Sequence, residues 1–110
     1  MDTQESYPGV TIRLCATSDI PEGEVLRVDL DDGRALAVYH WEGQFFATDD
    51  LCTHGDASLS EGEIEDGRIL CPFHMGSFDI RTGEAVAAPC SIAVRTYPLT
   101  TREGEVFLVD

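Results

Sequence analysis

The sequence predicts an all-β fold, a small antiparallel β-sandwich or partly open barrel of about eight to ten short strands. Apolar and polar residues alternate through several short segments, as they do in half-buried strands. Glycine-containing dipeptides typical of tight hairpin turns separate these segments. No segment combines a sustained helical period with helix caps. A chain of 110 residues suits one domain with a modest core, so we expect residues 1–110 to form a single domain.

The first predicted strand covers residues 10–15, where Val10, Ile12 and Leu14 are expected to point inward. Further strands are expected at residues 24–30, 35–41, 44–49, 77–80, 84–87, 92–97 and 105–109, with another hairpin within 63–71. Two-residue turns are expected at Asp32-Gly33, Glu42-Gly43, Asp66-Gly67, Thr82-Gly83 and Glu103-Gly104. Residues 50–80 are richer in glycine, cysteine and histidine than the flanking segments. We interpret them as a loop-borne site carried by a β scaffold.

The chain carries a formal net charge of −14, from 21 acidic residues against seven arginines and no lysine. This charge makes nucleic acid and anionic membranes poor partners, and we expect neither. It suits salt-dependent docking on basic protein surfaces, for which Asp56 and Glu61 are candidates. The N-terminal residues carry acids where a secretory signal needs cations, and no apolar run has the length of a membrane span. We therefore expect a cytoplasmic protein in which Cys15 and Cys90 are free thiols.

Four candidate metal ligands lie in two short pairs, Cys52 with His54 and Cys71 with His74. Sixteen residues separate the pairs, and flanking glycine and proline suit two tight loops. A single zinc ion could take two thiolates and two imidazoles, but zinc fingers usually group cysteine with cysteine and histidine with histidine. A two-iron cluster with cysteines on one iron and histidines on the other would take one ligand of each kind from each loop. The mixed pairs favour the cluster, with zinc as the alternative.

Residues 52–89, CTHGDASLSEGEIEDGRILCPFHMGSFDIRTGEAVAAP, carry these pairs at the spacing of Rieske [2Fe-2S] proteins. The segment resembles the Rieske ferredoxins that serve bacterial aromatic-ring-hydroxylating dioxygenases, and the length and strand pattern of the whole chain agree. The resemblance implies a Rieske-like fold with a cluster-binding subdomain at about residues 50–80, which holds one Rieske 2Fe-2S cluster. It also implies that Cys52 and Cys71 bind the inner iron, and that His54 and His74 bind the outer, more exposed iron.

The same resemblance implies a one-electron carrier of aromatic hydrocarbon catabolism rather than an enzyme. Such a ferredoxin would take electrons from an NAD(P)H-dependent flavoprotein ferredoxin reductase and pass them to a terminal oxygenase. The chain itself is not expected to be the oxygenase, because a mononuclear iron centre typically needs two histidines and a carboxylate, and only His40 remains. We expect His40 to be a structural or surface residue and the protein to be a monomer. Two alternatives stay open: a structural zinc-binding interaction module, and a Rieske small subunit held permanently in a larger oxidoreductase.

Respiratory members of this family carry two further cysteines, at positions that correspond to Ala57 and Phe73, so their loop-linking disulfide is not expected here. They also carry hydroxyl donors to the cluster sulfurs where this chain has Gly76 and Phe78. Fewer donors disfavour the more negative reduced cluster. The sequence therefore predicts a reduction potential toward the low end of the Rieske range of about −150 to +300 mV.

Residues beside the ligands have smaller expected roles. Phe73 and Met75 flank His74, and the resemblance implies that they shape the exposed tip around the histidines. Pro89 resembles the proline of a loop that packs over the cluster in this family. Its neighbour Cys90 is expected to be a buried small residue rather than a redox thiol.

Overall fold

The computed structural model describes residues 11–53, 55–72 and 76–109, which form eleven short strands and two single-turn 3₁₀ helices. The strands are β1 (Thr11–Ala16), β2 (Val25–Asp29), β3 (Ala35–Trp41), β4 (Gln44–Asp49), β5 (Ile64–Glu65), β6 (Arg68–Leu70), β7 (Ser77–Asp79), β8 (Ala85–Ala87), β9 (Thr96–Tyr97), β10 (Leu99–Arg102) and β11 (Glu105–Val109). The 3₁₀ helices are η2 (Thr17–Asp19) and η3 (Leu59–Glu61). The predicted all-β class is confirmed.

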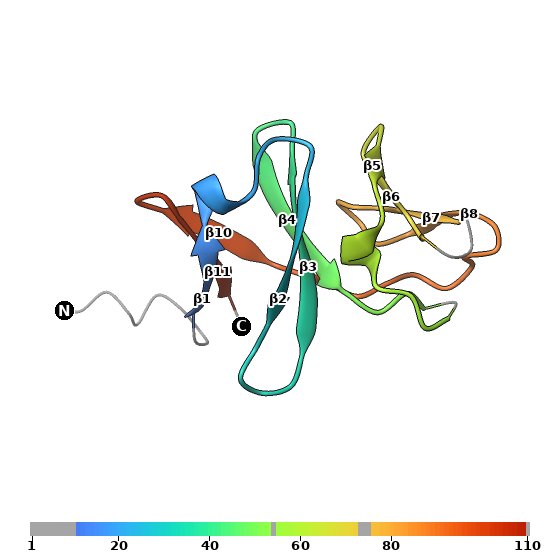
Figure 1. The fold of residues 1–110 in the computed structure, drawn as a ribbon, viewed down its shortest axis with the longest axis horizontal. Coiled ribbons are helices and arrows are strands. Elements are labelled where there is room, and N and C mark those ends of the chain that lie inside the picture. Colours follow the sequence, from blue (N-terminus) through green and yellow to red (C-terminus); the bar gives the residue numbers. More distant parts are fainter. Residues whose placement is uncertain (1–10, 54, 73–75, 110) are drawn as a thin grey trace.

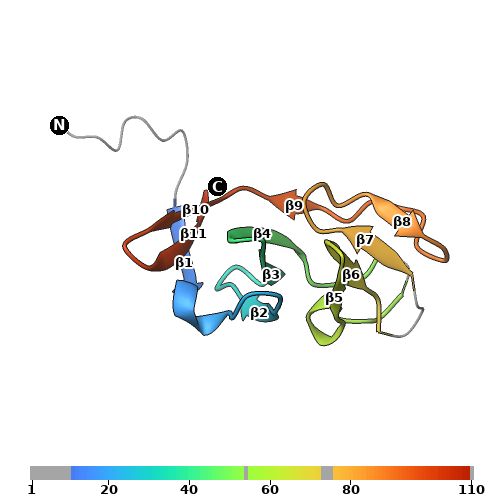
Figure 2. The same ribbon diagram turned by 90° about the horizontal axis from the view of Figure 1, so that it is seen from above.

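The strands form three antiparallel sheets, which follow one another along the molecule (Figure 1). The first sheet has the order β1-β11-β10, and the central sheet has the order β2-β3-β4-β9. The third sheet, β5-β6-β7-β8, lies at the end of the molecule opposite the first sheet, as Figure 2 also shows. In the described part of the chain these sheets do not close into a barrel. The third sheet and the segments beside it carry the candidate site.

Three of the predicted two-residue turns have both central residues in the left-handed region. The φ angles are 53° and 76° at Glu42-Gly43, 56° and 78° at Asp66-Gly67, and 53° and 81° at Glu103-Gly104. Two successive positive φ angles match the twist of the flanking antiparallel strands, and glycine adopts the second one without a Cβ penalty. These turns therefore set the register of β3 with β4, β5 with β6, and β10 with β11.

The hairpin between β2 and β3 forms as predicted, but its turn is longer than two residues. Leu30 donates its N–H to the carbonyl of Arg34 at 2.8 Å, so three residues span the turn. Only Gly33 among them has a positive φ, 96°. The carboxylate of Asp32 accepts hydrogen bonds from the backbone N–H of Arg34 at 3.0 Å and from its guanidinium at 2.9 Å. These side-chain contacts stabilise a wider turn than the Asp-Gly pair alone predicts.

The first strand also departs from strict alternation. A bulge lies between Arg13 and Cys15 in the pairing of β1 with β11. As a result the consecutive residues Leu14 and Cys15 are both buried. Val10, which was expected to begin this strand, lies outside the described residues.

Near the C-terminus the predicted strand at residues 92–97 is reduced to the two residues of β9. The strand β10 was not predicted, because its sequence, Leu-Thr-Thr-Arg, has one apolar residue and no alternation. Its position follows instead from pairing with β11, where Leu99 lies opposite Leu108. Long-range pairing thus creates a strand that the local pattern does not show.

The central strand β3 separates two buried cores. Leu36 and Val38 pack into the core beneath the first sheet, together with Cys15. Ala37 and Tyr39 point the other way, because successive side chains alternate across a strand. The core on their side, which lies toward the third sheet, contains Ala37, Tyr39, Cys52, Ala57, Leu59, Ile69, Cys71, Phe78, Ile80, Cys90 and Val94. Three of the four cysteines therefore belong to one apolar cluster.

Candidate metal centre

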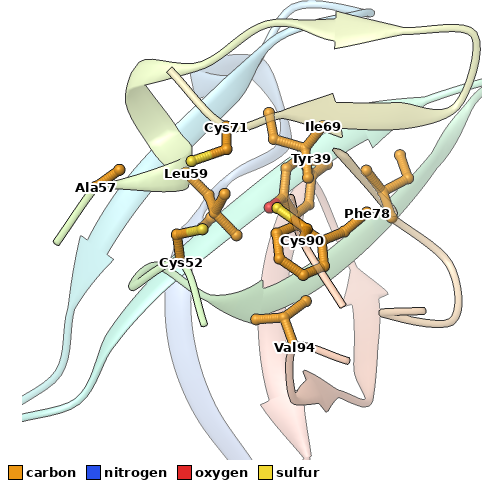
Figure 3. Packing of buried hydrophobic residues seen from close by; sticks show 11 residues of the cluster. Tyr39, Cys52, Ala57, Leu59, Ile69, Cys71, Phe78, Cys90 and Val94 are labelled. Carbon is orange, nitrogen blue, oxygen red and sulfur yellow. The ribbon is translucent and has the colours of Figure 1, made fainter. Parts of the chain in front are cut away.

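The two cysteines predicted as ligands lie in the core next to the third sheet. Their exposed fractions are 2% for Cys52 and 1% for Cys71, so both thiols are shielded from solvent. Cys90, from a third segment of the chain, joins them with 4% exposure (Figure 3). Cys15 and Cys90 are both free thiols. The expectation that Cys15 and Cys90 do not pair is confirmed, and the two belong to different cores.

Each predicted ligand cysteine begins a loop that its own backbone closes. Cys52 donates its N–H to the carbonyl of Ala57 at 2.9 Å, and Cys71 donates its N–H to the carbonyl of Gly76 at 2.7 Å. In each closure four residues lie between the two hydrogen-bonded partners, and one of them is a candidate histidine by sequence. The two halves of the motif therefore share the same backbone closure, which begins at the cysteine.

The first loop is anchored at its base by Asp50. The N–H of Asp50 donates to the carbonyl of Ala35 at 2.9 Å, which ties the loop to β3. The N–H of Leu59 donates to the Asp50 carbonyl at 2.7 Å, and the N–H of Ser60 donates to the Asp50 carboxylate at 2.9 Å. A single residue thus holds together the two ends of the segment that contains Cys52.

A third segment, residues 87–92, lies against both loops, at Thr53 and at Gly76. It includes the cis peptide bond between Ala88 and Pro89. The hydroxyl of Thr53 donates to the carbonyl of Ile92 at 2.6 Å, which links this segment to the first loop. Cys90 donates its N–H to the carbonyl of Ala87 at 3.1 Å, so a turn directs its side chain inward. The expectation that Cys90 is a buried residue is confirmed.

The electrostatic setting of Cys90 reflects its neighbours. Burial raises the pKa of the Cys90 thiol to about 12, and interactions with the thiols of Cys52 and Cys71 add to the effect. The cause is general, since a thiolate is poorly solvated in an apolar site and is repelled by neighbouring sulfur groups. Cys90 is therefore a buried thiol in the same cluster as the two candidate ligands.

The two described members of the predicted ligand set, Cys52 and Cys71, fit an iron-sulfur cluster. Two adjacent buried thiols can supply two thiolate ligands, and the loops that they begin carry two imidazoles by sequence. His54 and His74 lie outside the described residues, as do Phe73 and Met75. Within the described ranges no group of three or more His, Cys, Asp or Glu side chains is arranged to hold a metal ion.

Other residues singled out in the sequence have clear positions. Phe78 is fully buried against the cysteines, and Asp56 and Glu61 are exposed. His40 lies in the central sheet, where its Nδ1 is 2.7 Å from the carbonyl oxygen of Ile20. Its ring also stacks on Phe45 at 4.2 Å between centroids. These contacts confirm a structural role for His40.

The position of Cys90 in one buried cluster with both candidate ligands was missed in the sequence. Cys90 lies nineteen residues after Cys71, with no spacing pattern that links it to the motif. The one available signal was the neighbouring Pro89, because the resemblance places that residue in a loop over the cluster. The contact depends on how residues 87–92 fold back over the third sheet, which no local pattern shows.

No helix in the described part of the chain is both long enough and apolar enough to cross a membrane.

Comparisons with known proteins agree with this arrangement. The family model described as "Rieske [2Fe-2S] domain" matches residues 10–98. Among relatives, the chain is 52% identical over 98 residues to the "p-cumate 2,3-dioxygenase system, ferredoxin component" of Pseudomonas putida, a match that covers 88% of this chain and 83% of the relative.

Two solved structures have the same fold across nearly their whole length. The "Sphingomonas yanoikuyae B1 ferredoxin" has a TM-score of 0.88 and 46% identity, covering 92% of this chain and 99% of that chain. A chain in the "Complex of reduced oxygenase and oxidized ferredoxin in carbazole 1,9a-dioxygenase" has a TM-score of 0.86 and 40% identity, covering 92% and 94%. On the family match and these identities, the chain belongs to the Rieske [2Fe-2S] family and resembles its ferredoxins over most of their length.

Proposed function

We propose that this chain is the ferredoxin component of an aromatic-ring dioxygenase system. A Rieske 2Fe-2S cluster accepts and releases one electron when it is bound. The chain supplies two buried cysteines for it. Relatives with this function match the chain over most of its length, and one is named for the p-cumate system. The protein is thus an electron carrier and not an enzyme.

For the ligand set we propose Cys52 and Cys71 on one iron and His54 and His74 on the other. The observation that carries this proposal is the pair of equivalent backbone closures, Cys52 to Ala57 and Cys71 to Gly76, each of which begins at a buried cysteine. Thiolates at the buried base and imidazoles further along each loop would place the cysteine side of the cluster inward. The single domain of residues 1–110, with a cluster-binding part at about residues 50–80, belongs to the same proposal, and the β5-β8 sheet supports it.

The partners that we propose are a flavoprotein ferredoxin reductase as electron donor and a terminal oxygenase as acceptor. A related ferredoxin is present in a complex with its oxygenase. Near the loops, Leu51 and Ile92 have 61% and 66% of their surface exposed, so they offer apolar contacts at the rim of the site. The net charge of −14 favours basic partner surfaces. We further propose that the protein is a cytoplasmic monomer that shuttles between the two partners.

The ligand set is tested by spectroscopy on the purified holoprotein. We expect two irons and two acid-labile sulfides per chain, and a Rieske-type EPR signal after reduction with dithionite. His54→Ala and His74→Ala should each abolish this signal. His40→Gln should retain it, because His40 contacts Ile20 and Phe45 in the central sheet and is not a proposed ligand. A colourless protein that contains zinc and no sulfide would contradict the cluster.

Electron transfer is tested with the reductase and oxygenase of the p-cumate 2,3-dioxygenase system. With NAD(P)H as the reductant, the oxygenase should turn over only when this protein is added. The rate should fall as salt is raised, since charge attraction between exposed groups is screened. A complex with a larger subunit that stays stable at physiological salt would contradict a mobile shuttle. Analytical ultracentrifugation of the free protein measures whether it is a monomer.

A further inference from the structure

Cys90 places a third thiol directly beside the two predicted ligand sulfurs. Its side chain belongs to the same buried cluster as those of Cys52 and Cys71, and interactions with both thiols help to raise its pKa. The sulfur of Cys90 points into the space that the other two cysteines face, with Phe78 and Val94 in the same cluster (Figure 3). With 4% of its surface exposed, Cys90 has no access to water that could replace these contacts.

The backbone of the second ligand loop leaves room for this thiol. A Cβ atom at Gly76 would lie 2.5 Å from the Cys90 sulfur and 2.9 Å from the Cys90 backbone nitrogen. Both distances are far below normal van der Waals contact. The carbonyl of the same Gly76 accepts the N–H of Cys71 at 2.7 Å. The Cys90 sulfur therefore packs directly on the backbone that closes the loop of Cys71, in the place where a side chain at position 76 would lie.

We propose that the S–H group of Cys90 donates a hydrogen bond to a ligand thiolate, Cys52 or Cys71, and thereby raises the reduction potential of the cluster. This proposal rests on the ligand set proposed above. Once both ligands are bound thiolates, their sulfurs can only accept hydrogen bonds, whereas Cys90, which is not among the proposed ligands, brings an S–H donor into the same buried cluster. A hydrogen bond to a ligand sulfur withdraws charge and stabilises the more negative, reduced cluster. Cys90 is thus a positioning and tuning residue that exchanges no electron itself.

The variants Cys90→Ala, Cys90→Ser and Cys15→Ala separate this role from packing. Cys90→Ala removes the donor, whereas Cys90→Ser keeps a donor of similar size. Cys15→Ala is the matched control, since Cys15 is equally buried at 4% but belongs to the other core. The midpoint potential of each holoprotein is measured by a spectroscopic redox titration. Pulsed EPR of the reduced protein in H₂O and in D₂O detects exchangeable protons near the cluster.

We expect a more negative potential for Cys90→Ala and the loss of one exchangeable proton coupling. Cys90→Ser should restore the potential to the value of the unmodified protein or above it, because a hydroxyl is a stronger donor than a thiol. Cys15→Ala should leave both readouts unchanged. An unchanged potential and an unchanged proton coupling in Cys90→Ala would overturn the proposal.

Two further outcomes distinguish this proposal from the proposed function. If Cys90→Ala cannot retain the cluster, the comparison of the unmodified protein with Cys90→Ser decides. A potential of Cys90→Ser more negative than that of the unmodified protein, although the hydroxyl keeps a donor, would overturn the role of Cys90. If the unmodified protein lacks a Rieske EPR signal, the ligand set fails and the role of Cys90 fails with it.

Discussion

The carboxylate of Asp50 accepts a hydrogen bond from the backbone N–H of Ser60 at 2.9 Å, although only 3% of the Asp50 side chain is exposed. The guanidinium of Arg27 lies 3.5 Å from the other carboxylate oxygen. A buried carboxylate normally requires such partners to offset its loss of hydration. Asp50 therefore connects β2 to the segment that holds Cys52.

Replacing Asp50 should loosen the first ligand loop. Asp50→Ala leaves the Ser60 N–H without its acceptor and removes the partner of Arg27, and we expect a loss of about 2–3 kcal/mol in unfolding free energy. Asp50→Asn keeps an acceptor oxygen and should lose less. Denaturant unfolding monitors stability, and the decay of visible absorbance monitors cluster loss. Asp31→Ala, at an exposed turn residue, is the control, and equal effects of the two alanine variants would contradict the anchoring role.

Adding a methyl group at Gly76 should disturb the site by overpacking. The new Cβ would meet the Cys90 sulfur at 2.5 Å and the Ala87 carbonyl oxygen at 2.9 Å, and the backbone oxygen cannot rotate away. We expect Gly76→Ala to lower unfolding free energy by about 1–3 kcal/mol and to accelerate cluster loss.

A matched glycine variant separates local crowding from general backbone strain. Gly104 has a φ of 81°, but no atom lies within 4 Å of the place that a Cβ atom would occupy there. Gly104→Ala should therefore cost only the strain of its backbone, about 1–2 kcal/mol. Its cluster should decay at the rate of the unmodified protein. If Gly76→Ala retains its cluster as long as the unmodified protein does, the predicted effect of crowding at Gly76 on the site is wrong.

The Thr53 hydroxyl donates a hydrogen bond of 2.6 Å to the Ile92 carbonyl. This bond should slow the local opening of residues 87–92. Thr53→Val preserves the shape of the side chain and removes the donor. Because the bond is exposed, we expect a modest stability loss of about 0.5–1.5 kcal/mol, with faster hydrogen exchange in residues 87–92. Thr53→Ser keeps the hydroxyl and should behave like the unmodified protein. If hydrogen exchange in residues 87–92 is the same in Thr53→Val and in the unmodified protein, this bond does not stabilise that segment.

The carboxylate of Glu22 should make stability depend on pH in the acid range. It accepts hydrogen bonds from the backbone N–H groups of Gly43 at 3.0 Å and Glu42 at 2.6 Å, which lower its pKa. A lowered pKa in the folded state means that the stabilisation is present above the unfolded value of 4.5 and is lost as pH falls through the folded pKa. Glu22→Gln should therefore lower Tm above pH 4.5, with the deficit shrinking at lower pH.

Thermal unfolding of both proteins across about pH 2.5 to 6, a window that brackets the carboxyl pKa, measures this effect. Glu65→Gln changes the net charge by the same amount at an exposed hairpin position and serves as the control. A Tm deficit of Glu22→Gln that stays constant with pH would contradict the assignment to this carboxylate.

Local sequence patterns predicted much of the scaffold. β4 has the predicted bounds of residues 44–49, and Glu42-Gly43 and Asp66-Gly67 form the predicted turns. These features depend on neighbours in the sequence, since side-chain alternation and a positive φ act over a few residues. The pairs Cys52 with His54 and Cys71 with His74 could be found for the same reason. Their joint binding of one cluster stays a prediction, because both histidines lie outside the described residues.

Patterns failed where distant contacts decide. β10 has no alternation of its own and exists because Leu99 pairs with Leu108. The bulge at Cys15 likewise follows from the register of β1 with β11. In both strands the free energy comes from pairing and burial against the rest of the sheet, which outweigh local preference.

By itself, the sequence determined an acidic all-β chain that carries two Cys-His pairs with Rieske spacing. Only the tertiary structure decided that Asp50 is buried beneath one ligand loop and that Cys90 shares a buried cluster with both candidate ligand cysteines. The physical reason is range: ligand spacing and turn conformation are properties of a few consecutive residues. Which thiol meets which sulfur depends on the folding of residues 87–92 over a sheet formed earlier in the chain.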